Sequence, residues 1–101
     1  MYLKPGLRLA STVCGTEVVV VRAPRAPVDL RCGGRAMVVK GEAAAEGELD
    51  PAYGEGTLIG KRYADEDAGV EVLCTKAGEG SLSIGDEPLH VKDAKPLPSS
   101  D

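Results

Sequence analysis

Hydrophobic and polar residues alternate along most of the chain with a period of two, which is typical of β-strands with one buried face. The clearest segment is Glu17–Arg22, where four consecutive valines lie between two charged residues. This run predicts a strand that is buried on both faces. Shorter patterns of the same kind predict further strands at residues 7–13, 28–32, 36–40, 57–63, 70–75, 81–84 and 89–92.

Glycine and proline separate these segments about every ten residues, a spacing that indicates turns between short antiparallel strands. Gly33-Gly34 predicts a hairpin that joins 28–32 to 36–40, and residues 85–88 predict the turn of a second hairpin. We therefore expect an all-β fold, either a small barrel or a two-sheet sandwich, with seven or eight short strands. No internal repeat is evident in the sequence.

Two segments do not follow the alternating pattern. Residues 41–56 are acidic and rich in glycine, and they predict a long loop that could contain one helical turn around residues 42–48. Residues 95–101 are polar and contain two prolines, so we expect a disordered tail. The predicted organisation is one β domain over residues 1–94 and a flexible tail over 95–101.

Composition narrows this prediction. The chain has 101 residues, of which 43% are hydrophobic, with three tyrosines and no tryptophan or phenylalanine. The core must therefore consist mainly of valine, leucine and alanine. No stretch approaches the roughly 20 apolar residues of a membrane-spanning helix, and the first ten residues lack the apolar run of a signal peptide. We expect a cytoplasmic protein. The frequent use of Ala, Gly, Arg, Val and Asp is typical of bacteria with GC-rich genomes.

The net charge of -4 is distributed unevenly. Residues 1–40 carry a charge of +5, residues 41–69 carry -6 and residues 70–101 carry -3. These charges are either ordinary solvated side chains, or they support self-association or docking on an acidic protein partner. The candidate partner-binding residues are Arg22, Arg25, Arg31 and Arg35. Nucleic acid is not expected as a partner, because the chain is acidic overall and no aromatic residues accompany the basic ones.

Cys14, Cys32 and Cys74 each follow a predicted strand and precede a turn that contains glycine. Backbone N–H groups in such turns can stabilise a thiolate, which is why metal-binding knuckles often place cysteine before glycine. With His90 as a fourth ligand, the three cysteines would form a Cys3His site for zinc or iron. Their odd number excludes a complete set of intramolecular disulfides. The alternatives are buried structural thiols, a reactive thiol, or an intermolecular disulfide.

Motifs for catalysis are weak. The segment from Gly54 to Arg62 departs from a phosphate-binding loop at two required positions, and nothing orients His90 toward a serine. We therefore predict a non-enzymatic accessory or interaction module, a subunit or homo-oligomer that acts through protein contacts and needs no cofactor. The alternative is a small zinc or iron metalloprotein.

Overall fold

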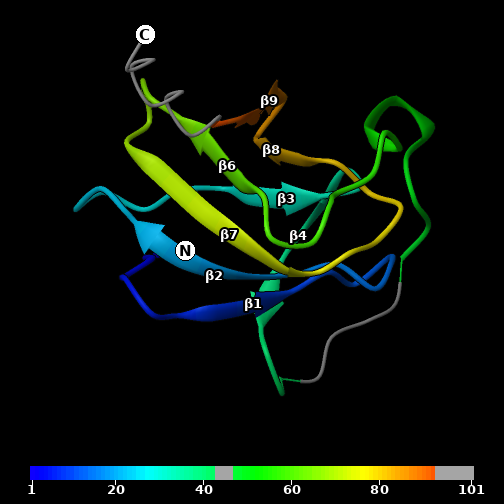
Figure 1. Ribbon diagram of the computed structural model, residues 1–101, viewed down its shortest axis with the longest axis horizontal. Coiled ribbons are helices and arrows are strands. Elements are labelled where there is room, and N and C mark those ends of the chain that lie inside the picture. Colours follow the sequence, from blue (N-terminus) through cyan, green and yellow to red (C-terminus); the bar gives the residue numbers. More distant parts are fainter. Residues whose placement is uncertain (43–46, 93–101) are drawn as a thin grey trace, which may run out of the picture.

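The computed structural model describes residues 1–42 and 47–92, which form two antiparallel sheets (Figure 1). The all-β prediction is confirmed. Of the two predicted alternatives, the two-sheet arrangement describes the structure. The described elements are β1 (Arg8–Ala10), β2 (Glu17–Arg22), β3 (Leu30–Cys32), β4 (Arg35–Ala36), β5 (Val38–Val39), the 3-10 helix η1 (Pro51–Tyr53), β6 (Arg62–Asp65), β7 (Val70–Lys76), β8 (Leu82–Ile84), β9 (Glu87–Pro88) and β10 (His90–Val91).

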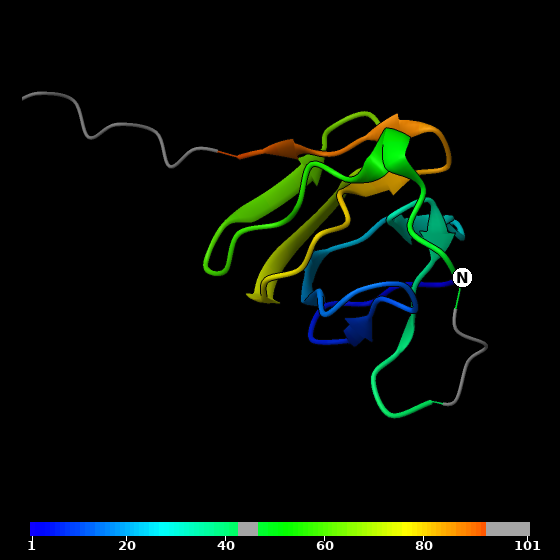
Figure 2. The same ribbon diagram turned by 90° about the vertical axis from the view of Figure 1, so that its right-hand side faces the viewer.

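The larger sheet has six strands in the order β10-β6-β7-β2-β1-β5, and the smaller has four in the order β4-β3-β8-β9. Figure 2 gives the side view, in which the yellow β7 of the larger sheet and the teal β3 of the smaller sheet lie in different layers. β2 pairs with β7 at the centre of the larger sheet, and β3 pairs with β8 at the centre of the smaller one. The outermost strands are only two residues long.

Side chains alternate between the core and the outer face of the larger sheet, as the period-two pattern predicts. In β2, Val18 and Val20 are buried, whereas Val19 is only half-buried and Val21 is exposed, so the prediction that this strand is buried on both faces is wrong. Tyr63 is the one aromatic side chain in the core of the described residues. The remaining buried hydrophobic residues are mostly aliphatic: Leu3, Leu9, Leu30, Met37, Val70, Val72, Leu82 and Leu89, with Cys32 and Cys74 among them.

Two segments each contribute strands to both sheets. Residues 35–39, which include most of the strand predicted at 36–40, form β4 in the smaller sheet and β5 in the larger sheet, with the buried Met37 between them. The buried Leu89 separates β9 from β10 in the same way. The turn predicted at 85–88 is shorter than expected, because Glu87 and Pro88 form β9. The N–H of Met37 donates to Leu30 O and that of Leu89 donates to Leu82 O, both at 3.0 Å. At each of these two bends, one short segment supplies a strand to both sheets and so connects the two layers at a corner of the sandwich.

The strand order is unchanged when the two halves of the chain are exchanged. If β1 to β5 exchange names with β6 to β10, in the same sequence, each sheet keeps the same strand order when it is read from its other end. Each half makes a hairpin in the larger sheet, a hairpin in the smaller sheet and a short last strand that pairs with its own first strand. The structure thus has a repeat that was not evident in the sequence, and the strand order of the fold is related by a pseudo-two-fold axis between β2 and β7.

The strand register matches residues of the two halves one to one. Arg8 lies opposite Val19, as Arg62 lies opposite Leu73, and Ala10 lies opposite Glu17, as Ala64 lies opposite Glu71. Identical residues occupy many matched positions. The identical pairs are Arg8 and Arg62, Ala10 and Ala64, Glu17 and Glu71, Val18 and Val72, Leu30 and Leu82, Gly33 and Gly85, Val39 and Val91, and Lys40 and Lys92.

The loop predictions fare differently. The described helical turn, Pro51–Tyr53, lies inside the loop predicted at 41–56, and it begins where the Asp50 carboxylate accepts a hydrogen bond from the N–H of Ala52. Four residues of the predicted turn, 43–46, are outside the described residues, as is the predicted tail at 95–101. The strand expected at 57–63 begins only at Arg62, because residues 57–61 form a turn whose single ladder contact joins Thr57 to Gly78.

Candidate functional site

Two of the three cysteines meet between the sheets. Cys14 lies in the turn between β1 and β2, and Cys32 is the last residue of β3. Their sulfur atoms are 3.8 Å apart. Cys14 is half-buried and is one of the residues that line a shallow surface groove, whereas Cys32 has no exposed surface. The structure therefore brings together one partly exposed and one fully buried cysteine.

The turn around Cys14 surrounds its sulfur with polar groups. The thiol lies 3.3 Å from Ser11 Oγ and 3.2 Å from Thr16 Oγ1, and the N–H of Gly80 donates a hydrogen bond to Cys14 Sγ at 3.4 Å. Burial alone would raise the pKa of Cys14, but these hydrogen bonds outweigh it and lower the pKa to about 7. Burial, with the nearby Cys14, raises the pKa of Cys32 to about 12. The two thiols thus differ in acidity as well as in access.

Two glycines leave room for the sulfur atoms. A Cβ atom at Gly78 would lie 3.0 Å from Cys14 Sγ, and one at Gly80 would lie 3.0 Å from Cys32 Sγ and 2.9 Å from the backbone nitrogen of Gly33. These distances are shorter than ordinary van der Waals contacts. Positions 78 and 80 therefore have to lack side chains for the backbone to pack against the thiols.

The other two predicted metal ligands are elsewhere. Cys74 is buried in β7, where its thiol donates to Lys76 O, and His90 is exposed in β10 opposite Ala64. Within residues 1–42 and 47–92, no group of three His, Cys, Asp or Glu side chains is arranged to hold a metal ion. The predicted set of Cys14, Cys32, Cys74 and His90 is therefore not assembled, and only its first two members come together.

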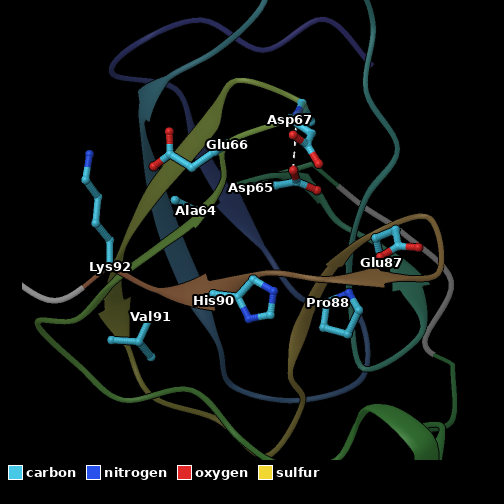
Figure 3. Close-up of a pocket in the computed structure, with 10 residues that line it drawn as sticks. Ala64, Asp65, Glu66, Asp67, Glu87, Pro88, His90, Val91 and Lys92 are labelled. Atoms are coloured by element: carbon cyan, nitrogen blue, oxygen red, sulfur yellow. Dashed lines mark hydrogen bonds between the residues drawn. The ribbon is translucent and has the colours of Figure 1, made fainter.

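His90 lines a shallow pocket at the edge of the larger sheet, together with the acidic turn at residues 65–67 (Figure 3). The turn is held by Asp65, whose carboxylate accepts a hydrogen bond from the N–H of Ala68 at 3.0 Å. Figure 3 shows the imidazole of His90 and the carboxylates of this turn as separate groups on the lining. Among the described residues, no serine, threonine or cysteine lines this pocket beside His90.

The four predicted partner-binding arginines do not share one sheet. Arg22 ends β2 in the larger sheet, Arg25 is exposed in the following loop, and Arg31 and Arg35 lie in the smaller sheet. Arg31 forms an ion pair with Asp29 at 2.7 Å. Only Arg22 belongs to the charged arrangement described next, so a common binding role for all four remains a prediction.

The outer face of the larger sheet carries a carboxylate enclosed by three cations. The side chain of Glu71 is only 5% exposed, and it lies 2.8 Å from Lys92 Nζ, 3.5 Å from Arg62 and 3.7 Å from Arg22. The hydrogen bond from Lys92 lowers the pKa of Glu71 against the opposing effect of burial, and the charges of Lys92, Arg62 and Arg22 add to the decrease. The carboxylate is therefore satisfied, while its partners keep 40 to 58% of their side chains exposed.

A second cluster repeats the first in the other half of the chain. Glu17 lies 2.9 Å from Lys40 and 3.9 Å from Lys76, and the charge of Arg8 also lowers its pKa. Arg8, Glu17 and Lys40 are the counterparts of Arg62, Glu71 and Lys92 across the pseudo-two-fold axis, and Lys76 corresponds to Arg22. We call the two groups together the paired cation clusters, six basic residues around two carboxylates: Arg8, Lys40 and Lys76 with Glu17, and Arg22, Arg62 and Lys92 with Glu71.

Half-buried aliphatic side chains lie between these clusters. Val19 and Leu73 are directly opposite each other in the register, with Arg8 beyond Val19 and Arg62 beyond Leu73. Directly opposite residues of antiparallel strands point to the same face. One row across four strands thus reads arginine, valine, leucine, arginine, with an apolar centre and charged ends.

These clusters are hard to predict from local patterns, because their members come from strands far apart in the chain. The only signal was the recurrence of Arg, Glu and Lys at the matched positions of the two halves. Among the described residues, no helix is long and apolar enough to cross a membrane. Comparison with protein-family models, curated proteins and solved structures finds no match to the chain.

Proposed function

We propose that the protein is a non-enzymatic interaction module that docks an acidic protein segment on the outer face of its larger sheet. The paired cation clusters carry this proposal. Each cluster has three basic side chains for one carboxylate, so the face is basic although the chain as a whole has a net charge of -4. A local charge opposite to that of the whole molecule favours an oriented encounter with an acidic partner.

The apolar row adds a centre to this surface. Protein interfaces typically combine a less polar core with a polar rim. Val19 and Leu73 supply such a core, and the arginines at both ends of the row, Arg8 and Arg62, supply the rim. Five of the six basic side chains remain 40 to 65% exposed and Arg8 is exposed as well, so their unused donors are accessible to carboxylates of a partner.

The spacing of the clusters defines the partner further. Glu17 lies opposite Lys76 and Glu71 lies opposite Arg22, so the cluster centres are about five strand residues apart, or roughly 16 Å. An extended acidic segment of a similar length could contact both clusters at once. A nucleic acid fits less well, because each cluster contains a carboxylate and the row between them offers no aromatic surface on which bases could stack.

The test uses a fluorescent peptide of about 12 glutamates, which spans roughly 40 Å when extended. Its binding is followed by fluorescence anisotropy at low and at moderate salt. We expect Arg62→Glu and Arg8→Glu each to weaken binding about 3- to 10-fold, because each reversal replaces an exposed attraction with a repulsion. Wild-type affinity should also decrease as salt increases.

Arg25→Glu is the matched control, since Arg25 is an exposed arginine in the loop after β2 and carries the same change of charge. If it weakens binding as much as Arg62→Glu, binding depends on total charge and not on this face. Tighter binding of a DNA duplex of equal charge would identify the wrong class of partner. Self-association of the wild-type chain that Arg62→Glu abolishes would identify a second copy as the occupant and would equally overturn the proposal.

A further inference from the structure

We propose that Cys14 and Cys32 form a reversible thiol–disulfide couple, in which Cys14 attacks small-molecule disulfides and Cys32 resolves the product. This inference is independent of the docking face. It rests on the direct contact of the two sulfur atoms at 3.8 Å, on their unequal access and on the polar groups that surround only one of them.

The pseudo-two-fold axis supplies an internal comparison. The N–H of Cys14 donates to Ser11 Oγ, just as the N–H of Ala68 donates to the carboxylate of Asp65 at the matched turn. Cys14 therefore corresponds to Ala68, and Cys32 corresponds to Ile84 in the register of β3 and β8. Ala68 and Ile84 are partly buried apolar residues that pack against the core. The fold thus tolerates ordinary apolar residues at both positions, and only one half carries the thiol pair.

The surroundings of Cys14 suit an attacking thiolate. Two hydroxyl groups and the N–H of Gly80 can all donate to an anionic sulfur, and each such bond favours the ionised form. Cys14 also lines the groove through which a small disulfide can approach. Cys32 has no exposed surface, so an external disulfide cannot reach it, but it lies in contact with Cys14 Sγ.

The reaction balances in two exchanges. The Cys14 thiolate attacks one sulfur of a small disulfide RSSR, forms a mixed disulfide with it and releases RS⁻. Cys32 then loses its proton to the released thiolate and attacks Cys14 Sγ, which expels a second RS⁻ that takes up a proton from solvent. Overall, two protein thiols are oxidised to one disulfide and one RSSR is reduced to two RSH. The new bond would join the β1–β2 turn to the end of β3, and so the larger sheet to the smaller one.

The experiment exposes the native full-length chain to oxidised glutathione and follows intact mass, with non-reducing peptide mapping of the product. We expect the wild type to lose two hydrogens per chain through a transient glutathione adduct, and the map to contain a Cys14–Cys32 disulfide. Cys32→Ala should stop at a stable adduct on Cys14. Cys14→Ala, which places alanine where the other half has Ala68, should not react under the same conditions.

Cys74→Val is the matched control, because Cys74 is buried and corresponds to Val20 of the first half. It should be oxidised at the wild-type rate. Oxidation should also raise the melting temperature of the wild type by at least about 5 °C, since the bond closes the chain between residues 14 and 32. Cys14→Ala and Cys32→Ala should show no such increase, which separates cross-linking from other effects of the oxidant.

The pH dependence of the first exchange gives a further readout. In Cys32→Ala, alkylation of Cys14 by iodoacetamide should reach half its maximal rate near pH 7. Among the described residues, the charged groups near it include Glu42, which lines the same groove, Arg35, whose side chain lies beside Gly47 of that groove, and Lys76, whose side chain lies near Gly15. A stable adduct on wild-type Cys14, equal reactivity of Cys74, or cross-linking that occurs only in denaturant would each overturn the proposal.

Discussion

The enclosed carboxylate of Glu71 makes a sharp prediction for Glu71→Gln. The substitution removes the negative charge from the group that accepts a hydrogen bond from Lys92 at 2.8 Å, so the remaining bond to the glutamine oxygen is weaker than the ion-paired bond, a type that contributes about 1.5–3 kcal/mol. It also removes two longer ion pairs with half-exposed arginines, each of which contributes less than about 1 kcal/mol. Because Lys92 is itself partly exposed, we expect a total loss of about 2–3 kcal/mol in the free energy of unfolding.

Glu17, the counterpart of Glu71 in the other half of the chain, provides a comparison for the size of this effect. The side chain of Glu17 is 22% exposed, against 5% for Glu71, and its second ion pair is longer at 3.9 Å. We therefore expect Glu17→Gln to destabilise the protein by only about 1 kcal/mol. The exposed Glu87 serves as a control, and Glu87→Gln should change the unfolding free energy by less than about 0.5 kcal/mol.

Urea unfolding followed by far-ultraviolet circular dichroism measures all three variants. The urea midpoint should be highest for Glu87→Gln, lower for Glu17→Gln and lowest for Glu71→Gln. The slope of the unfolding free energy against urea should be unchanged, which indicates a change of stability rather than of the unfolded state. For a domain of this size, the loss in Glu71→Gln corresponds to a decrease of roughly 10–20 °C in melting temperature. Equal midpoints for Glu71→Gln and Glu87→Gln would refute the reasoning, as would a larger effect at Glu17.

The same carboxylate predicts a pH dependence with a definite sign. The pKa of Glu71 is lowered in the folded protein, so its contribution is complete above its unfolded value of 4.5 and is lost as the pH falls through the folded value. The unfolding free energy of the wild type should decrease below about pH 4.5. Glu71→Gln should show a smaller decrease over the same range, and parallel pH profiles for the two proteins would contradict this assignment.

Three further predictions concern packing and the metal hypothesis. Gly80→Ala should cost about 1–3 kcal/mol and slow oxidation of the thiol pair, because its Cβ would crowd Cys32 Sγ; urea midpoints and the glutathione assay measure both effects. Met37→Ala and Leu89→Ala should each cost about 2–5 kcal/mol, since both buried side chains hold the bends that join the sheets, and a loss below about 1 kcal/mol at either would be unexpected. Elemental analysis of protein purified without chelator should find far less than one zinc or iron per chain, because only two of the four predicted ligands meet; a stoichiometric metal would restore the metalloprotein alternative.

Local patterns predicted most of the secondary structure. The strand at Glu17–Arg22 was predicted with its observed bounds, because four valines between charged residues leave little choice of conformation. The bends at Met37 and Leu89 were missed. Both lie inside short apolar runs, and nothing in such a run distinguishes a continuous strand from one that changes sheets. Only the positions of the neighbouring strands decide between them.

The repeat and the paired cation clusters were missed for a related reason. Matched residues such as Glu17 and Glu71 are 54 positions apart up to the end of β2 and 52 positions apart from β3 on, because the β2–β3 connection is two residues longer than the β7–β8 connection, and the identical residues are scattered among different ones. The similarity becomes clear only when the strand register aligns them. The convergence of Cys14 and Cys32 was predicted in part, because the strand-to-turn positions of the cysteines are local features. Cys74 and His90 share such features but face other parts of the fold.

The central pairing of β2 with β7 also has a consequence for the way the protein is made. During synthesis, the valine-rich β2 leaves the ribosome well before β7, its neighbour at the centre of the larger sheet. Until then, the nascent chain presents an unpaired strand edge of high β-propensity, a typical starting point for aggregation. Glu17 and Arg22, at the two ends of the valine run, act as gatekeepers against such pairing. The charges that shape the finished surface therefore also protect the unfinished chain.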